Sequence, residues 1–461
     1  MVYPATPLVV RIYLFVSGAW LDVTLDVYAR DQIAVTWGRQ DWASTADTTK
    51  CPLTFNNGES KAAPGIVGRY SRRNTSSDLY GQLSLNTPVR VDLVTPAGTV
   101  AVRFEGHISS WPTRWDVSGK DVYTKVTANG VRRRLAQGKK LLKDPLRRHI
   151  QSAGPLNYWP LTDGESAIQG SEVMQGSQPV RAIGKTGAFF QGQPDWGKGT
   201  LAAWLDSVVA LPANTEGSLT TRLPKPPPSR WTCDHVRAGV GGQEDDLTVY
   251  DNAPGTDAQP ITAWLVVANH TVNQVQLRVV SAGETASSLT ALATINNPGI
   301  FDLLPHLIRL TVMDNGATAM DWELFIDGQS VASGTHAIPY RPATRIRYRW
   351  GAFASLTEPL ALGHLALWET PPAAIDTWRA VQGYARERAG RRIERLCAEE
   401  RVALEVNGDL DLTTPMGPQK SGSFLDLLQS AADVDGGALY ESREMAGLAY
   451  RTRVSKYNQG L

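Results

Sequence analysis

Cysteine is scarce in this sequence. Three cysteines, Cys51, Cys233 and Cys397, occur in 461 residues and lie far apart along the chain. This spacing excludes a local CxxC site, and the odd number argues against a framework of disulfides, because such frameworks pair an even number of cysteines. We therefore expect the chain to be made and folded in a reducing cytoplasm.

The sequence also lacks a long apolar run and an excess of one charge. Arg11 interrupts the apolar run in MVYPATPLVVRIYLFVSGAW, which falls short of the roughly 20 apolar residues that span a bilayer. The formal net charge is +1, with 46 basic and 45 acidic residues, so no strong field of one sign steers a charged partner. We expect no membrane span and no sequence-specific binding of nucleic acid.

The familiar motifs of metal and nucleotide sites are missing as well. None of the seven histidines has a second histidine three or four residues away, the spacing that places two zinc ligands on one helical face. The segment GKTG at 184–187 resembles part of a phosphate-binding loop, but Pro179 occupies the position of the required first glycine. The sequence therefore predicts no cofactor.

What the sequence does contain is a large share of turn formers and aromatic residues. Its 41 glycines, 28 prolines and 14 tryptophans favour many short strands joined by turns. Up to about residue 130, apolar and polar residues alternate with the period of a half-buried strand, as in WLDVTLDV at 20–27. The expected fold class is mainly β with minor α, with β-barrel domains interrupted by a jelly-roll β-sandwich.

The first predicted domain covers residues 1–150 and is a β-barrel with a basic helical end. That end is VRRRLAQGKKLLKDPLRRHI at 131–150, where Asp144 and Pro145 break the helix in two. A basic stretch of this kind is typical of contact with nucleic acid or an acidic neighbour, or of a solvated helix face. The solvated face is favoured, because no aromatic stacking residues are interleaved.

Two further domains are predicted, at 151–370 and 371–461. In the former, strand patterns such as AWLVVA, HLIRLTVM and WELFIDG have the spacing of a two-sheet sandwich of jelly-roll type. The latter has helical patterns with a break at Gly390 and a stop at Gly436, and then a hairpin that turns near Gly447. Because the sequence stops at Leu461 straight after the hairpin, we expect it to be part of a longer chain.

If the jelly-roll domain were a retaining glycosidase, it would need two carboxyl groups roughly 5 to 5.5 Å apart. The candidates are Glu244 with Asp246 and Glu323 with Asp327. In WELFIDG, however, Asp327 and Gly328 make a natural turn, which explains the acidic residue without catalysis. We expect that the chain is not an enzyme; the alternative is a carbohydrate-active enzyme acting on a host cell-wall polymer.

The stretch FNNGESKAAPGIVGRYSRRNTSSDLYGQLSLNTPVRV at 55–91 carries the most specific pattern of the chain. It resembles a signature of minor tail proteins from long-tailed phages of actinobacteria, which ends in L-Y-G-x-L-x-x-N-T-P-V-R-V. The segments VTWGR at 35–39, FEGHISSWPTRWD at 104–116 and YTKVTANGVRRRLAQG at 123–138 resemble other parts of the same first hub domain. The sequence departs from the family at 71–73, where the family has a proline, and at 60–64.

The remainder of the chain extends this resemblance. Residues 151–370 are similar to the laminin G or concanavalin-like sandwiches inserted in such tail proteins, through YWPL at 158–161, WELFIDGQSV at 322–331 and LGHLALWET at 362–370. Residues 371–461 resemble the return to the hub after the insertion. The resemblance implies β-barrel hub domains in which 1–150 and 371–461 pack on one another, while the inserted sandwich has its own core.

The resemblance also implies a role and partners. The role is that of a structural tail hub or baseplate protein that connects the tail tube to the tip, at the distal end of the tail in the virion. The implied partners are further copies in a homotrimer, the distal tail protein of the tube, the tape measure protein and other tail-tip proteins. The particle is a phage or a phage-derived injection device. The sandwich is expected to contact the host surface.

The stretch 55–91 contains several tyrosines and arginines, which are residue types enriched at interface hot spots. Two interpretations stay open for it: the side chains dock against a neighbouring subunit, or the tyrosines pin the loop to its own domain. The candidate inter-subunit residues are Arg69, Tyr70, Arg72, Arg73 and Tyr80.

A glycan site in the sandwich needs an aromatic face with amides and carboxylates nearby. The candidates are Trp231, His235, Gln243 and Asp246, with a host cell-wall glycan as the ligand and a bound calcium ion left open. Five other tryptophans lie in apolar strand patterns and are expected in the core: Trp159, Trp264, Trp322, Trp350 and Trp368.

Overall fold

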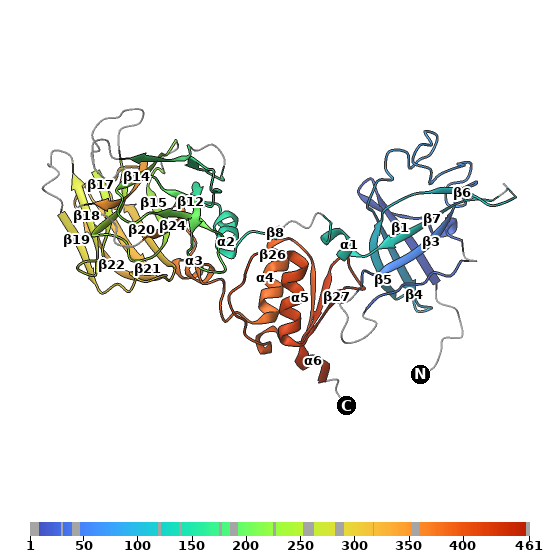
Figure 1. Cartoon of the computed structure of the whole chain (residues 1–461). Helices are drawn as coiled ribbons and strands as arrows, with labels where there is room; N and C mark the ends of the chain where they lie inside the picture. The colour runs from blue at the N-terminus through green and yellow to red at the C-terminus, as the bar shows by residue number, and fades with distance from the viewer. Residues whose placement is uncertain are drawn as a thin grey trace. The chain divides into compact units, whose positions relative to one another are not determined.

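The chain divides into two compact units, whose elements are labelled in Figure 1. The terminal unit combines residues 1–141 with 387–416 and 422–461, and the sandwich unit comprises 142–386 with 417–421. The computed structural model describes residues 9–28, 31–38, 47–118, 121–137, 141–174, 178–184, 192–224, 227–251, 262–281, 290–316, 318–352 and 359–457.

The prediction of a mainly β chain with minor α is confirmed, since strands make up most of the regular structure of both units. In the terminal unit, one sheet carries the N-terminal part of the chain, and its apolar face packs around Phe55, Tyr70 and Trp111. Its strands, in spatial order, are β2 (Ala19–Asp22), β1 (Val9–Val16), β4 (Thr87–Val94), β5 (Val100–Ile108), β7 (Val122–Asn129) and β3 (Lys50–Asn56), and β6 (Thr113–Trp115) also pairs with β7.

This sheet is not closed into the barrel that the sequence suggested. Its order begins at β2 and ends at β3, and no ladder joins these two strands in the stretches that the structure describes. Two isolated bridges, Val27 with Phe55 and Thr36 with Lys50, link the segment after β2 to β3. A barrel requires a continuous ladder at this place.

A 3-10 turn, η1 (Thr24–Asp26), replaces the second half of the strand predicted over 20–27. Asp22 accepts a hydrogen bond from Thr24 N, and the Thr24 hydroxyl accepts one from Ile12 N, both of 2.9 Å. Hydrogen bonds between side chains and the backbone compete with the strand ladder, so the chain turns away from the sheet. The turn leaves Leu25 exposed and buries Asp26.

The C-terminal part of the terminal unit packs helices on a three-stranded sheet. In this sheet β25 (Leu404–Asn407) runs parallel to β28 (Leu448–Arg451), and β27 (Ala438–Glu441) runs antiparallel to it. The pair β27 and β28 is the predicted hairpin, with Gly447 directly before β28. The helices are α4 (Ala389–Glu399), α5 (Phe424–Asp435) and the short α6 (Arg453–Tyr457), with the turn η2 (Leu410–Leu412).

The ends of α5 agree with the sequence, whereas the break at Gly390 does not. Ser423 caps the start of α5 by accepting a hydrogen bond from Asp426 N, and Gly436 ends it with a left-handed φ of 71°. Gly390 lies inside α4, and Leu410 and Thr413 lie so close that a side chain would not fit there. The glycine is thus required for close contact, and the helical segment breaks earlier, at 382–388.

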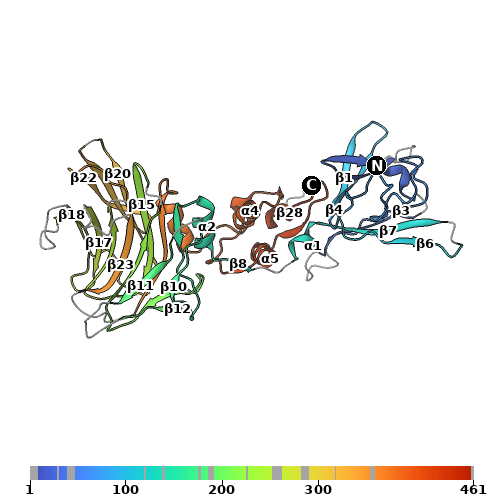
Figure 2. The same ribbon diagram turned by 90° about the horizontal axis from the view of Figure 1, so that it is seen from above.

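The sandwich unit consists of two large sheets, each seen as a separate layer in Figure 2. The order in one sheet is β10 (Gln169–Gly170), β11 (Val180–Gly184), β14 (Gly217–Arg222), β23 (Arg345–Ala352), β16 (Glu244–Tyr250), β17 (Thr262–Asn269), β18 (Gln274–Ser281) and β19 (Thr290–Asn296). The order in the other is β12 (Asp195–Gly199), β13 (Val208–Leu211), β24 (Leu360–Trp368), β15 (Arg230–Ala238), β20 (His306–Asp314), β21 (Met320–Ile326) and β22 (Gln329–His336), with β9 (Asn157–Trp159) also paired to β24.

Aromatic and aliphatic side chains from both sheets fill the space between them. Trp159, Trp264, Trp322 and Trp350 are buried in this core, as predicted. Strands that alternate inward and outward residues and stack their inner faces are typical of a β-sandwich. The turn predicted in WELFIDG is also present, because Asp327 and Gly328 have positive φ angles of 52° and 80° between β21 and β22.

A second apolar cluster lies where helices cover the sheet that contains β24. Leu146 and Ile150 of α2 (Pro145–Ala153) and Val381 of α3 (Ala374–Val381) belong to it, together with Trp368 of β24. Burial of these side chains joins both helices to the sandwich. The unit boundaries therefore lie at 141/142 and 386/387, whereas the sequence suggested 150/151 and 370/371.

The basic stretch 131–150 is not one broken helix but three short elements. They are α1 (Val131–Leu135), β8 (Leu141–Leu142), which pairs with β26 (Gly422–Ser423), and the start of α2. Asp144 caps α2 by accepting a hydrogen bond of 2.9 Å from Arg147 N, and Pro145 occupies the first helical position. The two residues thus begin a helix, which is where proline is tolerated.

Candidate binding surfaces

The loop that follows β3 is anchored by the buried carboxylate of Asp26. Its Oδ2 accepts hydrogen bonds from Ser60 Oγ at 2.7 Å, Tyr70 Oη at 2.8 Å and Arg69 Nη1 at 3.2 Å, and its Oδ1 accepts from the backbone N–H groups of Lys61 and Ala62. Burial alone raises the pKa of Asp26, but these hydrogen bonds outweigh burial and lower it. The carboxylate therefore stays ionised and holds the loop at two places, 60–62 and 69–70.

Two of the predicted interface residues point inward. Tyr70 is fully buried, with its ring 4.7 Å from that of Phe55 and stacked at 6.1 Å on Trp111. Arg69 is also buried and forms a second, bidentate pair with Asp78, at 3.0 and 2.7 Å. Both side chains thus pin the loop to its own sheet and offer no surface to a neighbouring subunit.

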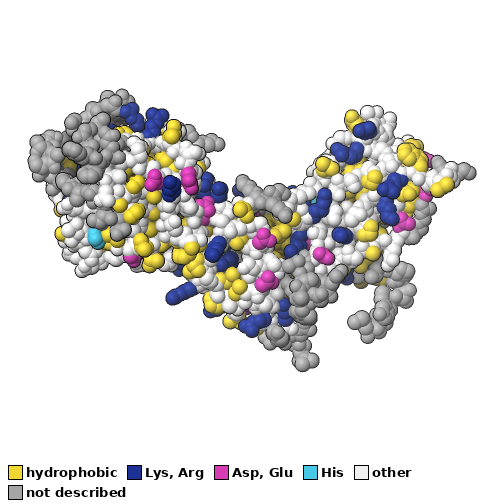
Figure 3. Space-filling view, viewed as in Figure 1, with side chains coloured by type: hydrophobic (Ala, Val, Ile, Leu, Met, Phe, Trp, Pro, Cys, Tyr) yellow, Lys and Arg dark blue, Asp and Glu magenta, His cyan; other side chains and the backbone are white. Residues whose placement is uncertain are grey.

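The other three candidate interface residues are exposed. Arg72 donates a hydrogen bond to Leu83 O at 3.0 Å, and Tyr80 is 52% exposed; Arg73 is exposed as well. In Figure 3, basic and acidic side chains are both scattered over the visible face. The loop therefore combines an inward anchor with an outward arginine and tyrosine surface.

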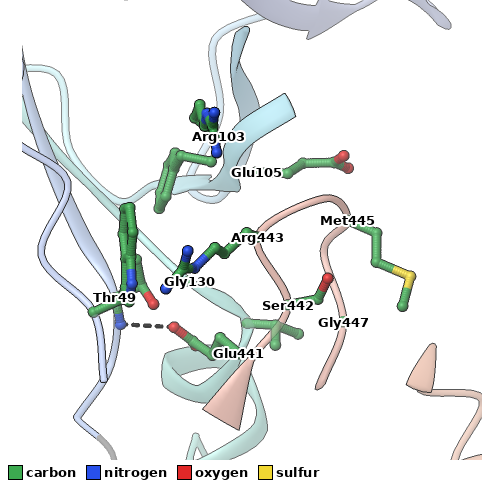
Figure 4. A pocket seen from close by; sticks show the side chains of 12 residues that line it. Thr49, Arg103, Glu105, Gly130, Glu441, Ser442, Arg443, Met445 and Gly447 are labelled. Carbon is green, nitrogen blue, oxygen red and sulfur yellow. Dashed lines mark hydrogen bonds between the residues drawn. The ribbon is translucent and has the colours of Figure 1, made fainter. Parts of the chain in front are cut away.

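A small cavity lies between the N-terminal sheet and the hairpin of the terminal unit, and Figure 4 shows its lining. Glu441 accepts hydrogen bonds from Thr49 N at 2.6 Å and from Arg132 N at 2.5 Å. Nearby, the Arg443 guanidinium lies 4.4 Å from the ring centre of Trp37. The cavity measures about 10 Å³, which is room for one water molecule and not for a ligand.

The four candidate glycan residues do not form one site. Trp231 and His235 are buried between the two sheets; Trp231 packs edge-on against Trp264, and the His235 ring lies 5.7 Å from that of Tyr348. Burial, and secondarily the charge of Arg237, lower the pKa of His235 to about 3. These two residues belong to the core, because they continue the inward alternation of β15.

Asp246 and Gln243 lie elsewhere. Asp246 is buried on the other face of its sheet, where it accepts hydrogen bonds of 2.6 Å from Arg349 Nε and from Thr248 Oγ1. Gln243, directly before β16, is exposed. Of the four candidates, Gln243 alone is available to a ligand in the described part of the chain.

Three of the four carboxylates considered for catalysis already have internal partners, namely Glu244, Asp246 and Asp327. Glu244 pairs with Arg278 at 3.0 Å, and Asp327 accepts hydrogen bonds from His306 Nδ1 and Leu307 N. Neither Glu244 with Asp246 nor Glu323 with Asp327 lines a described cavity. A pair of carboxyl groups that flanks a bound sugar is therefore not formed by these residues in the described structure.

One groove of ligand size lies at an end of the sandwich, in loops that the sequence reasoning did not select. It measures about 320 Å³, within the roughly 300–1,000 Å³ of small-molecule sites. The turn after β17 (270–273) and the segment before β20 (297–305) line it. The second segment, NPGIFDLLP, is rich in Gly and Pro around a single aromatic residue, which is the signal that could have found it. The lining residues are His270, Asn273, Gly299, Phe301 and Asp302.

The polar groups of this groove are held in place by neighbouring residues. Asp302 Oδ1 accepts hydrogen bonds from Leu304 N at 2.7 Å and His306 Nε2 at 2.9 Å. Burial slightly opposes ionisation, but these two hydrogen bonds lower the pKa of Asp302 overall. Asn273 Nδ2 donates to Asn297 Oδ1 at 2.8 Å, so the amide has a fixed orientation.

Metal sites and membrane-spanning helices are also absent from the described stretches. No group of three or more His, Cys, Asp or Glu there is arranged to hold a metal ion, calcium included. None of the helices in those stretches combines the length and the apolar composition that crossing a bilayer requires.

No protein-family model matches the sequence, and no curated protein matches it. Solved structures match parts of the chain. The receptor-binding domain of botulinum neurotoxin D matches with a TM-score of 0.34 and 8% identity, over 51% of this chain and 54% of that domain. This chain thus spans about half the length of the neurotoxin domain.

Two enzyme structures cover similar shares of the chain. Domain 4 of an extracellular arabinanase from Geobacillus stearothermophilus, in complex with arabinotriose, matches with a TM-score of 0.32 and 13% identity, over 48% of this chain and 97% of that one. The beta-glucanase of Bacillus licheniformis matches with a TM-score of 0.29 and 13% identity, over 46% and 97%. Similarities at this level carry no argument about function, and the sandwich assignment rests on the strand pairing given above.

Proposed function

We propose that this chain is a structural protein of a phage tail tip, of the tail hub or minor tail protein class, whose sandwich contacts the host surface. The observation that supports the proposal most is the insertion of one unit into another. Residues before and after the sandwich combine in the terminal unit. The Glu441 carboxylate, for example, accepts hydrogen bonds from Thr49 N and Arg132 N, more than 300 residues earlier in the chain.

The sequence resemblance follows the same division. The segments at 35–39, 55–91, 104–116 and 123–138, which resemble the first hub domain, all belong to the terminal unit. YWPL, WELFIDGQSV and LGHLALWET, which resemble inserted sandwiches, belong to the sandwich unit. A hub that carries an outward-facing module in one continuous chain is consistent with both facts.

Under this proposal, the terminal unit joins the tail tube to the tip, as a homotrimer in contact with the distal tail, tape measure and other tip proteins. The chain is made in the host cytoplasm and resides at the distal end of the tail. The exposed Arg72, Arg73 and Tyr80 are the part of the 55–91 loop that remains available to a neighbouring chain.

The sandwich is proposed to bind host glycan and not to cleave it. Three of the four candidate carboxylates, Glu244, Asp246 and Asp327, are engaged with arginine, histidine or backbone partners. Release of reducing sugar from host wall polymer by the purified chain, with loss of that activity in a Glu323→Gln variant, would support the enzyme alternative instead.

Electron microscopy tests the location. Antibodies against this chain are added to purified particles, which are then imaged in negative stain. We expect labelling at the distal end of the tail in particles that carry the chain, and labelling of the head or along the tube would overturn the proposal.

A shortened chain tests the insertion. Residue 141 is joined to residue 387 through a short Gly/Ser linker, so that 142–386 are removed. Because the sandwich has its own core, we expect the shortened chain to stay folded and to enter tails that no longer bind cells. Loss of cooperative unfolding in the shortened chain would indicate one shared core.

A further inference from the structure

We infer that the groove lined by His270, Asn273, Gly299, Phe301 and Asp302 binds a neutral sugar residue. The inference rests on the proposed function, glycan contact by the sandwich, and adds the site and the ligand class. The other two described cavities measure about 10 Å³ each, so this groove is the described cavity that admits a sugar ring.

An aromatic wall forms one side of the groove. The rings of His270 and Phe301 meet edge to face, with their centres 5.7 Å apart. The buried Arg237 guanidinium lies 5.4 Å from the centre of the Phe301 ring and so contacts it from the protein interior. A wall of this kind packs against the apolar C–H face of a sugar, because aromatic side chains pair apolar area with a fixed orientation.

Asp302 and Asn273 supply the polar contacts. Both described donors to the Asp302 side chain bind Oδ1, and its side chain is 50% exposed, so Oδ2 faces ligand or solvent. Asn273 uses Nδ2 to hold Asn297, which leaves Oδ1 as an acceptor. Carboxylate and amide oxygens fixed by other hydrogen bonds are acceptors that sugar hydroxyls bind without further ordering of the protein.

Charge selects the ligand class. The ionised Asp302 carboxylate repels phosphate and carboxylate groups. The two basic groups next to the groove are both paired with carboxylates, Arg237 with Asp245 and His306 with Asp302 and Asp327. Neutral sugars are therefore favoured over anionic wall polymers.

The residues next to the groove suit an exposed contact. Val272 and Leu303, which adjoin the lining residues Asn273 and Asp302 in the sequence, are 54% and 81% exposed. Exposed apolar side chains beside a polar pocket are a feature of recognition surfaces. A Cβ on Gly299 would meet no atom within 4 Å, which leaves the groove open on that side.

Two substitutions remove the polar contacts, each with a matched control in the same unit. Asp302→Ala is paired with Asp376→Ala, because the two carboxylates are 50% and 52% exposed. Asn273→Gly is paired with Asn214→Gly, because both asparagines are exposed and have positive φ angles, 51° and 57°, which glycine adopts without strain. Circular dichroism and thermal melting confirm that each variant is folded.

The assay uses the full-length chain, labelled with a fluorophore. Its probes are intact actinobacterial cells, the same cells stripped of wall polysaccharide, and the released neutral polysaccharide in solution. Loss of a hydrogen bond to a charged group corresponds to about tenfold weaker binding or more, and loss of one to a neutral amide to about threefold or more. We expect the former loss for Asp302→Ala and the latter for Asn273→Gly, on intact cells and in solution, and wild-type binding for Asp376→Ala and Asn214→Gly.

Two different failures are distinguishable. If the wild-type chain binds intact cells and loses binding on stripped cells, but Asp302→Ala and Asn273→Gly bind as the wild type does, this site is wrong while glycan contact stands. If the wild-type chain binds stripped and intact cells equally, or binds neither, the proposal that the sandwich contacts glycan is wrong, and so is the proposed site.

Discussion

The loop at 57–86 of the terminal unit and the groove loops of the sandwich unit each depend on an aspartate, but one aspartate is buried and the other is exposed. Asp26 of η1 is buried and anchors the 57–86 loop through Tyr70 and Arg69. In the groove loops, Asp302, Asn273 and His270 are exposed around an open groove.

The difference follows from the number of donors around each carboxylate. Asp26 accepts five hydrogen bonds, which offset the cost of burying a charge. Asp302 has described donors on one oxygen only, so its other oxygen keeps access to solvent or ligand. Residue type therefore indicates that a loop is polar and ordered, whereas the local supply of donors decides whether it serves stability or recognition.

The largest effect is expected for Asp26→Asn. The substitution leaves Arg69, which is 3% exposed, without its buried anionic partner, and the amide NH2 group then faces the Arg69 guanidinium where an acceptor oxygen stood. We expect the terminal unit to lose about 4 kcal/mol in the free energy of unfolding. Urea denaturation, with hydrogen exchange resolved by peptide, measures the loss in each unit separately.

Asp78→Asn is the control for Asp26→Asn, because Asp78 pairs with the same arginine but is 39% exposed. Its cost should stay below about 1 kcal/mol. Equal costs for the two variants would contradict the claim that the buried oxygen anchors the loop.

Gly130→Ala tests the second buried carboxylate of the terminal unit. A methyl group at Gly130 would overlap the Glu441 carboxylate and displace it from Thr49 N and Arg132 N. We expect a loss of about 3 kcal/mol, since each hydrogen bond to a charged group contributes about 1.5 kcal/mol or more. Gly164→Ala, where an added Cβ meets no atom within 4 Å, should be close to neutral in the same denaturation experiment.

The buried histidine of the sandwich core, His235, should make the free energy of unfolding depend on pH. Burial lowers the pKa of His235 from 6.5 to about 3, so below pH 6.5 the unfolded chain binds a proton that the folded chain does not. The stability contribution of neutral His235 is thus present above pH 6.5 and is lost as the pH falls toward 3. Between pH 6.5 and 4.5 this loss is on the order of 2 kcal/mol.

The measurement compares the pH dependence of unfolding in His235→Phe and in the wild-type chain. His235→Phe should lose less stability on acidification than the wild type, because the titrating group is gone. An identical pH dependence of His235→Phe and the wild-type chain would show that His235 does not couple folding to pH.

The smallest effect on stability is expected at the outward side of the 57–86 loop. Arg73→Ala and Tyr80→Ala remove exposed side chains and should change the free energy of unfolding by less than about 0.5 kcal/mol. Under the proposed function, they should still reduce incorporation of the chain into tails, measured by immunoblotting of purified particles. Normal incorporation of both variants would leave the loop with a purely internal role.

Local chemistry in the sequence was sufficient for several elements. Ser423 and Gly436 set the ends of α5, and Asp327 with Gly328 sets the turn between β21 and β22, because capping and positive φ depend on residues next to each other. The five tryptophans in apolar strand patterns are buried for a similar reason, since alternation along a strand fixes which side chains face inward.

Tertiary structure alone decided the open sheet, the direction of each polar side chain and the place of the groove. The alternation in 20–27 does not reveal that Thr24 binds Ile12 N and turns the chain out of the sheet. Trp231 and His235 have the chemistry of a sugar site but lie between two sheets, while His270 and Asp302 come together from different loops. Burial and donor supply depend on residues far apart in the chain, so the sequence determined the elements and their composition, and packing determined which polar groups remain free to bind.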